Sequence, residues 1–207
     1  MGVAAIAARG TNAVVDWAVG SRPISSEQYS GDMHLVKALP GEVLLAVVDG
    51  LGHGAEATEA AEVAIDALTE RAPAPLEALV RFCHERTQHT RGVALTLASI
   101  EGDGSRMSWL GVGNVEGVLL PANTDVKRET VMQRSGIVGY RLPTLQSSTL
   151  PVQPGDLLLL ATDGISSDFT DVVDRDAKPS RIADDILGTK ARMNDDALVL
   201  VARIRKL

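Results

Sequence analysis

The sequence contains very little cysteine and few aromatic residues. Its 207 residues include one cysteine, Cys83, and aromatic side chains make up 3% of the chain. A single cysteine excludes an internal disulfide, which is typical of proteins from a reducing compartment. Because aromatic residues are scarce, valine, leucine, isoleucine and alanine have to form the core. Cys83 falls in the middle of an expected helix, so we expect it to fill the core rather than to act as a nucleophile.

Long hydrophobic runs and an excess of basic residues are missing as well. No run approaches the roughly 18–20 apolar residues of a membrane-spanning helix. The first ten residues are too few and too weakly apolar for a signal peptide. The 20 basic and 27 acidic side chains give a formal net charge of −7, which disfavours nucleic acid as a partner. We therefore expect a cytoplasmic protein that binds neither nucleic acid nor a membrane.

Hydrophobic periodicity predicts an α+β fold in a single domain over residues 1–207. No segment resembles a linker or a repeat, and the length suffices for one sizeable core. Period-two and apolar runs predict strands, and alanine-rich or amphipathic periods predict helices. Strands are expected within 13–23, 32–39, 42–50, 93–102, 106–113, 116–122, 130–136, 154–164 and 197–207. Helices are expected over 54–71, 75–90 and 179–188. This order predicts two stacked sheets with helices outside.

Aspartates recur where the expected strands begin or end. Asp32 begins one strand, Asp49 and Asp163 end two others, and the pair Asp195 and Asp196 precedes the last. Strand ends can bring side chains from distant parts of the chain to one edge of a sheet. A carboxylate held against an apolar core is costly unless a positive group meets it. No lysine or arginine lies close in sequence to Asp49 or Asp163.

Two interpretations of these aspartates remain open at this point. Asp-Gly after a strand is a common turn, so a single instance indicates nothing more than a turn. The pattern occurs twice after apolar strands, however, as Asp49-Gly50 and as Asp163-Gly164. Mg²⁺ and Mn²⁺ prefer carboxylate and carbonyl oxygens, and a glycine lets its carbonyl turn inward at little steric cost. The alternative to two turns is therefore a metal site.

The order and spacing of the motifs resemble the PPM family of metal-dependent serine/threonine phosphatases. The motifs are SGD (30–32), VVDGLGHGAEA (47–57), PGDLLLLATDGISSDF (154–169) and NDDALVLV (194–201). The resemblance spans about residues 28–205 and is strongest to the SpoIIE-like branch. The compact single-domain form resembles the RsbX-type phosphatases of the stressosome.

The resemblance implies a β-sandwich of two antiparallel sheets flanked by α-helices, with two Mn²⁺ or Mg²⁺ ions at one end. Asp49 matches the carboxylate that bridges both metals, and Gly50 matches the residue that offers its backbone carbonyl to one of them. Asp163 matches a ligand of the other ion. Asp195 aligns with the first aspartate of the last motif and is expected to be the final ligand.

The same resemblance bears on four further positions. Asp32 matches an acidic residue that holds water at the metals without binding them directly. Asn114 stands where larger members use an aspartate for a third metal, so two metals are expected rather than three. His53 is expected to stabilise its turn rather than to ligate. Arg22, the nearest candidate for the arginine that grips the substrate phosphate in larger members, is expected to be a solvated side chain.

The activity implied is hydrolysis of phosphoserine and phosphothreonine in proteins by a water activated between two metal ions. The implied partners are phosphorylated STAS-domain proteins of a stressosome, whose signal a monomeric enzyme would reset. One alternative is the phosphatase of an anti-anti-sigma factor, although such enzymes usually carry an activating extension that this sequence lacks. Another is an inactive pseudo-phosphatase that only binds phosphoproteins. The retained Asp49, Asp163 and Asp195 argue against the second alternative.

Overall fold

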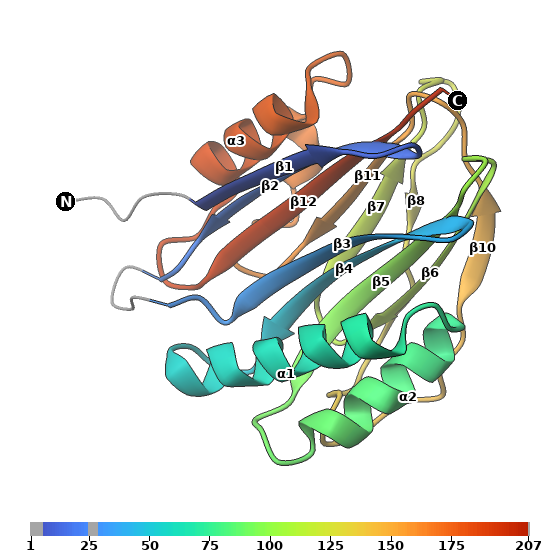
Figure 1. The fold of residues 1–207 in the computed structure, drawn as a ribbon. Coiled ribbons are helices and arrows are strands. Elements are labelled where there is room, and N and C mark those ends of the chain that lie inside the picture. Colours follow the sequence, from blue (N-terminus) through green and yellow to red (C-terminus); the bar gives the residue numbers. More distant parts are fainter. Residues whose placement is uncertain (1–5, 25–28, 207) are drawn as a thin grey trace.

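Two β-sheets stacked face to face form the centre of the structure, and α-helices cover both outer faces (Figure 1). The computed structural model describes residues 6–24 and 29–206. The first sheet has the strand order β1-β2-β12-β11-β7-β8, and the second has β10-β6-β5-β4-β3 with β9 joined to β6. The expected β-sandwich is therefore confirmed, with one exception to antiparallel pairing, because β9 runs parallel to β6.

The strands of each sheet come from both halves of the chain. The first sheet consists of β1 (Ile6–Thr11), β2 (Val15–Arg22), β7 (Glu116–Leu120), β8 (Glu129–Thr130), β11 (Leu157–Ala161) and β12 (Ala197–Ile204). The second consists of β3 (Asp32–Leu39), β4 (Glu42–Gly50), β5 (Val93–Glu101), β6 (Arg106–Val112), β9 (Gln133–Arg134) and β10 (Ser148–Pro151). Residues distant in sequence therefore meet at the sheet ends.

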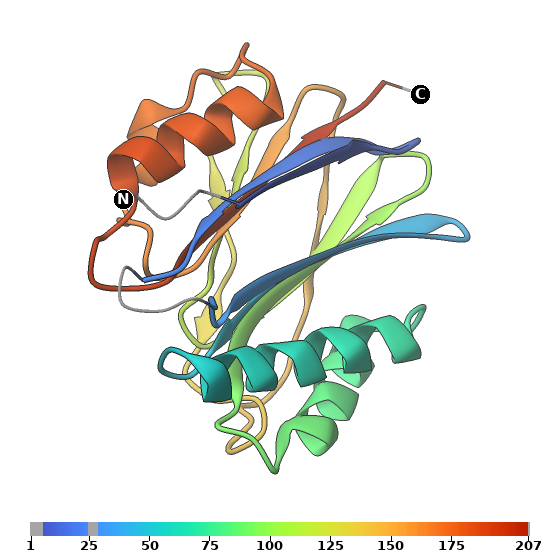
Figure 2. The ribbon, with the colours of Figure 1, turned by 60° about the vertical axis from the view of Figure 1, so that its left-hand side comes forward.

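The helices divide between the two outer faces. Helices α1 (Ala55–Arg71) and α2 (Leu76–Thr87) lie outside the second sheet, while α3 (Pro179–Lys190) and the short 3₁₀ helix η1 (Phe169–Val172) lie outside the first (Figure 2). The buried face of α1 is a row of alanines. The small side chains of this row let the helix lie close to the strands, as the sequence predicts: Ala57, Ala60, Ala61 and Ala64 are all fully buried. None of the helices among the described residues combines the length and hydrophobicity needed to cross a membrane.

Strand β4 is buried on both faces, which explains its uninterrupted apolar run. Leu45 and Val47 point into the core between the sheets, and Leu44 and Val48 pack under α1 and α2. All four are at most 1% exposed. Such two-sided burial is worth roughly 1.5–3 kcal/mol for each large aliphatic side chain, so the end of β4 is held rigidly.

Cys83 lies in the same layer under the helices. It is fully buried, and burial raises the pKa of its thiol to about 12. A thiol with this pKa stays protonated at neutral pH, which confirms the expectation that Cys83 fills the core.

Three elements differ from the expectation. Strands β1 and β10 were not expected, and the segment 130–136 forms two strands of two residues instead of one. Strand β8 pairs with β7 in the first sheet and β9 with β6 in the second. Val131 lies between them, buried in the core between the sheets. Pairings of two residues are too short to produce a hydrophobic period, so the crossing from one sheet to the other is not visible in the sequence.

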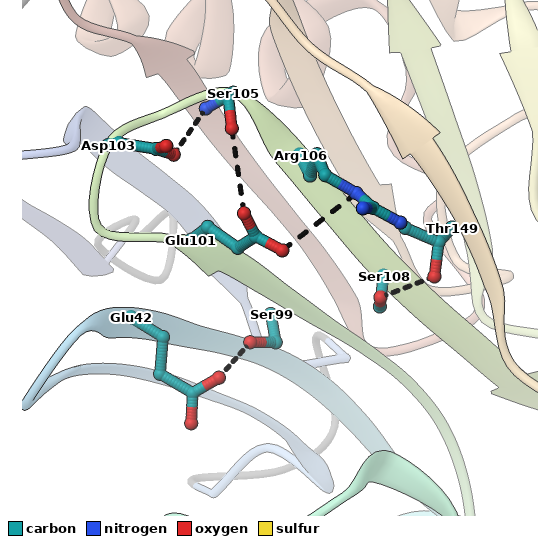
Figure 3. A network of polar contacts seen from close by, with 8 residues as sticks. All are labelled: Glu42, Ser99, Glu101, Asp103, Ser105, Arg106, Ser108 and Thr149. Carbon is teal, nitrogen blue, oxygen red and sulfur yellow. Dashed lines mark hydrogen bonds and ion pairs between the residues drawn. The ribbon is translucent and has the colours of Figure 1, made fainter.

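A network of polar contacts lies at the end of the second sheet where β4 and β6 begin (Figure 3). The Ser99 hydroxyl donates to the Glu42 carboxylate, and Ser108 Oγ lies 2.7 Å from Thr149 Oγ1. Arg106 Nε lies 3.9 Å from Glu101 Oε1. Strands β4 and β6 run from this end to the opposite one, where the acidic residues gather.

Candidate metal centre

One end of the sandwich carries all four aspartates that the sequence singles out. In the second sheet, β3 begins with Asp32 and β4 ends just after Asp49, and these two residues are register partners. In the first sheet, Asp163 follows the end of β11 and Asp195 precedes β12, which is the antiparallel neighbour of β11. The structure therefore brings the four carboxylates from two sheets to one edge.

Asp49 is a partly exposed carboxylate whose pKa is strongly raised by its surroundings. Burial, and next the negative charges of Asp163, Asp195 and Asp196, together raise the pKa of Asp49 to about 7. Hydrogen bonding from Asn114 opposes this rise. A like-charged cluster against an apolar core therefore favours the protonated form of Asp49.

Asp32 lies deeper, between the two sheets. It is 6% exposed, and its Oδ2 accepts a hydrogen bond from Thr162 Oγ1 at 2.7 Å. Burial, and next the charge of Asp49, raises the pKa of Asp32 well above its usual range, while the Thr162 bond lowers it. Thr162 in turn accepts from the Leu198 amide at 3.0 Å, so one hydroxyl joins β11, β12 and β3.

The sequence analysis missed Thr162. Its only signal is a hydroxyl residue standing directly before Asp163 at the end of an apolar strand. Thr162 is 1% exposed, and a buried hydroxyl requires a hydrogen-bond partner. Asp32 supplies that partner from 130 residues away.

The two neighbouring aspartates before β12 have different surroundings. Asp196 is 3% exposed, and its two oxygens accept from the amides of Ile24 and Gly31, each at 2.7 Å. Asp195 is half-buried. Burial, and next the charge of Asp163, raises its pKa, while His53 lowers it. Asp196 is therefore buried with both oxygens bonded to distant amides, whereas Asp195 is partly exposed and accepts from the adjacent Asp196 amide at 3.0 Å.

Glycines stand where backbone segments come into close contact around the cluster. A Cβ on Gly50 would lie 2.1 Å from the Ala57 carbonyl oxygen, and one on Gly164 would lie 1.7 Å from that of Asp196. The structure thus accounts for both Asp-Gly pairs by close packing of the backbone. Gly52 and Gly54 have φ angles of 89° and 75°, a conformation open to glycine that turns the chain from β4 into α1.

Two arginines flank the cluster. Arg91 pairs with Glu56 at the start of α1, and its Nη1 would lie 2.6 Å from a Cβ on Gly52. Arg22 was expected to be merely solvated, but its Nη2 donates to the Arg192 carbonyl at 2.7 Å. Arg22 therefore braces the backbone that leads into Asp195.

The chemistry of this end fits hard divalent cations. Its donors are carboxylate oxygens, the ligands that Mg²⁺ and Mn²⁺ prefer, and they repel one another until a positive charge arrives. Within residues 6–24 and 29–206, no three acidic, histidine or cysteine side chains already converge as a metal site requires. The carboxylates that could hold a metal are thus assembled at one edge but are not turned towards a common point.

Comparison with known proteins identifies relatives of the whole domain. The family model of stage II sporulation protein E (SpoIIE) matches residues 40–205. The chain is 24% identical over 136 residues to phosphoserine phosphatase RsbX of Bacillus subtilis (strain 168), a match that covers 66% of this chain and 67% of RsbX.

Solved structures match over most of the chain. A chain from the structure described as "The bacterial stressosome: a modular system that has been adapted to control secondary messenger signaling" is 30% identical, with a TM-score of 0.83. That match covers 91% of this chain and 99% of the other. RsbX in complex with magnesium is 19% identical with a TM-score of 0.86, and the match covers 96% of this chain and all of that one. The latter likeness bears on the fold alone.

The contrast between Asp195 and Asp196 predicts opposite effects on stability. In Asp196→Asn one of the amides of Ile24 and Gly31 faces an NH₂ group, so the free energy of unfolding should fall by about 1.5–3 kcal/mol. Asp195→Asn removes like-charge repulsion and should leave that free energy unchanged or raise it. Urea unfolding of both metal-free variants measures the difference. Equal losses in the two variants would contradict these assignments.

The raised pKa of Asp49 predicts how stability depends on pH in the metal-free protein. Between about pH 4 and pH 7 the folded protein keeps the Asp49 proton while the unfolded chain releases it, so stability falls as pH rises. Asp49→Asn should abolish this loss. Its advantage over the wild type in free energy of unfolding should be larger at pH 8 than at pH 5, by roughly 1–3 kcal/mol.

Urea unfolding in the presence of a chelator tests this pH dependence. Asp171→Asn, at an exposed position in η1, serves as the control and should show no such change with pH. An advantage of Asp49→Asn that stays constant between the two pH values would refute the prediction.

Proposed function

The chain belongs to the stage II sporulation protein E (SpoIIE) family and is a PPM-type serine/threonine phosphatase, and we propose that it acts through two divalent metal ions held by the acidic end of the sandwich. The observation that carries the proposal is the gathering of Asp49, Asp163 and Asp195 from two sheets at one edge. Mn²⁺ or Mg²⁺ would offset the repulsion that the three carboxylates otherwise experience.

Each residue has a separate part in the proposed metal centre. The charges of both Asp163 and Asp195 raise the pKa of Asp49, so Asp49 lies near both, as a carboxylate that would bridge two ions must. Asp163 and Asp195 would each hold an ion from the first sheet, and the Gly50 carbonyl would add a neutral oxygen from the second. Asp196 takes no part, because its oxygens already accept from the backbone amides of Ile24 and Gly31.

When bound, the two ions would lower the pKa of a water nucleophile and offset the charge of the phosphate oxygens. Asp32 would orient that water. Thr162 donates to Oδ2 of Asp32, which leaves the other carboxylate oxygen to accept a hydrogen bond from the water. Strands β3, β4 and β12 hold these groups on rigid elements, so the water would be aligned with phosphorus before reaction.

The proposed substrates are phosphorylated STAS-domain proteins, and the proposed role is resetting the signal of a stressosome. This part is supported by the 30% identical chain from the bacterial stressosome structure and by the similarity to phosphoserine phosphatase RsbX. The descriptions of these two relatives apply to the relatives themselves, and we propose the same role for this chain.

Hydrolysis of p-nitrophenyl phosphate tests the metal centre. The wild type should turn over this ester with Mn²⁺ and lose the activity when a chelator is added. Asp49→Asn, Asp163→Asn and Asp195→Asn should each lower kcat/KM by at least about 100-fold, because each removes a ligand of the ions that activate the nucleophile. Asp171→Asn, an exposed aspartate away from the edge, should retain activity. Unchanged activity in Asp49→Asn would refute the proposed centre.

Competing phosphoproteins test the substrate. The enzyme should release phosphate from a phosphorylated stressosome STAS domain at least about tenfold faster than from a phosphorylated anti-anti-sigma factor. The two proteins present different surfaces around the phosphorylated residue, and the enzyme is expected to fit the first. Phosphate release is measured on both with the same enzyme preparation. The opposite preference would assign the enzyme to the anti-anti-sigma factor. Mn²⁺ binding without hydrolysis of any ester would indicate a pseudo-phosphatase.

A further inference from the structure

Asn114 stands between the two sheets at the acidic end. Its Nδ2 donates a hydrogen bond to Asp163 Oδ2 at 2.6 Å. Hydrogen bonding from Asn114 also lowers the pKa of Asp49. The bond joins the turn between β6 and β7, which connects the two sheets, to the carboxylate that follows β11.

The backbone around Asn114 imposes this position. Gly113 has a φ of 94°, and a Cβ there would lie 2.4 Å from the Cβ of Ala94, which is the register partner of Asp49. The Gly113 amide donates to the Arg134 carbonyl at 3.0 Å. On the other side, Thr96 Oγ1 donates to the Val115 carbonyl at 2.6 Å in a buried bond. The chain therefore presents the amide to the cluster from a turn that is fixed on both sides.

The amide and a cation would compete for the same oxygen. Asp163 Oδ2 is directed at Asn114, and within the described part of the chain no three acidic, histidine or cysteine side chains converge on one point. Donation to a carboxylate stabilises its charge, as a bound cation would. The Asn114 hydrogen bond thus stabilises an arrangement in which the carboxylates face the amide instead of a metal.

We propose that Asn114 is a positioning residue that holds the Asp163 carboxylate in the metal-free enzyme and gives up its bond to Asp163 when a divalent cation binds. The amide thereby fixes the Asp163 carboxylate at the acidic end while lowering the affinity for the metal. This inference rests on the proposed function in one respect only, which is that the cation binds at these carboxylates.

Calorimetric titration of chelator-stripped protein with Mn²⁺ alone tests the competition. Asn114→Ala should bind the first Mn²⁺ about 3- to 10-fold more tightly than the wild type, because the metal no longer displaces a solvent-accessible hydrogen bond to a charged group. Asn123→Ala is the matched control. Asn123 is likewise exposed and uses its side chain in a turn, where Oδ1 accepts from the Asp125 amide at 3.0 Å, so this variant should bind Mn²⁺ like the wild type.

A second measurement uses the wild type and does not depend on the folding of a variant. Titration with Mg²⁺ should move the NMR signals of the Asn114 side-chain NH₂ towards those of a solvent-exposed amide such as Asn123. Equal or weaker Mn²⁺ binding by Asn114→Ala, or Asn114 NH₂ signals that stay in place at saturating Mg²⁺, would overturn the inference. A wild type that binds neither ion would instead refute the proposed function.

Discussion

Mutual repulsion among carboxylates at one end of a β-sandwich is the constraint on which the functional part of this structure depends. The charges of Asp163, Asp195 and Asp196 raise the pKa of Asp49. Asp32 is the register partner of Asp49 on the neighbouring strand. In the metal-free protein, neutral donors offset part of this cost. Thr162 donates a hydrogen bond to Asp32, Asn114 donates to Asp163, and the amides of Ile24 and Gly31 donate to Asp196.

The sandwich supplies the rigidity that such a cluster needs. Strand β4 is buried on both faces, and β12 lies between β2 and β11 in the first sheet, so neither can move its terminal carboxylate away from the others. Close backbone contacts at Gly50 and Gly164 tighten the same edge. The fold therefore holds like charges together, and it leaves a cation as the group that would relieve the repulsion most completely.

This arrangement links the metal-free and metal-bound forms of a PPM-type phosphatase. Hydrogen-bond donors are weak substitutes for cations, because they stabilise individual carboxylates but cannot collect several of them around one point. The donors that the structure places at the edge differ in kind. Thr162 and the Gly31 amide donate in buried hydrogen bonds. Asn114 instead donates to Asp163 in a bond that is exposed to solvent. The exposed donor is the one that a cation would displace at the smallest cost.

Much of the fold was visible in the sequence because it rests on local patterns. Strands β3 and β4 have the predicted bounds, and the alanine face of α1 lies against the sheet as its spacing indicates. The short strands β8 and β9 were not visible as separate elements, since pairings of two residues carry no period. The strand at the N-terminus, β1, was missed because only its partner β2 identifies it as part of a sheet.

The candidate site divides in the same way. Apolar runs that end in Asp-Gly determined by themselves that Asp49 and Asp163 would lie at strand ends, and the strand patterns that follow Asp32 and Asp195 placed those two at strand starts. Only the tertiary structure decided what each carboxylate contacts. Thr162 reaches Asp32 across 130 residues, the distant amides of Ile24 and Gly31 bond Asp196, and Asn114 reaches Asp163 from the turn that joins the sheets. Those contacts join residues far apart in the chain, and no local period in the sequence encodes which distant donor will meet a given oxygen.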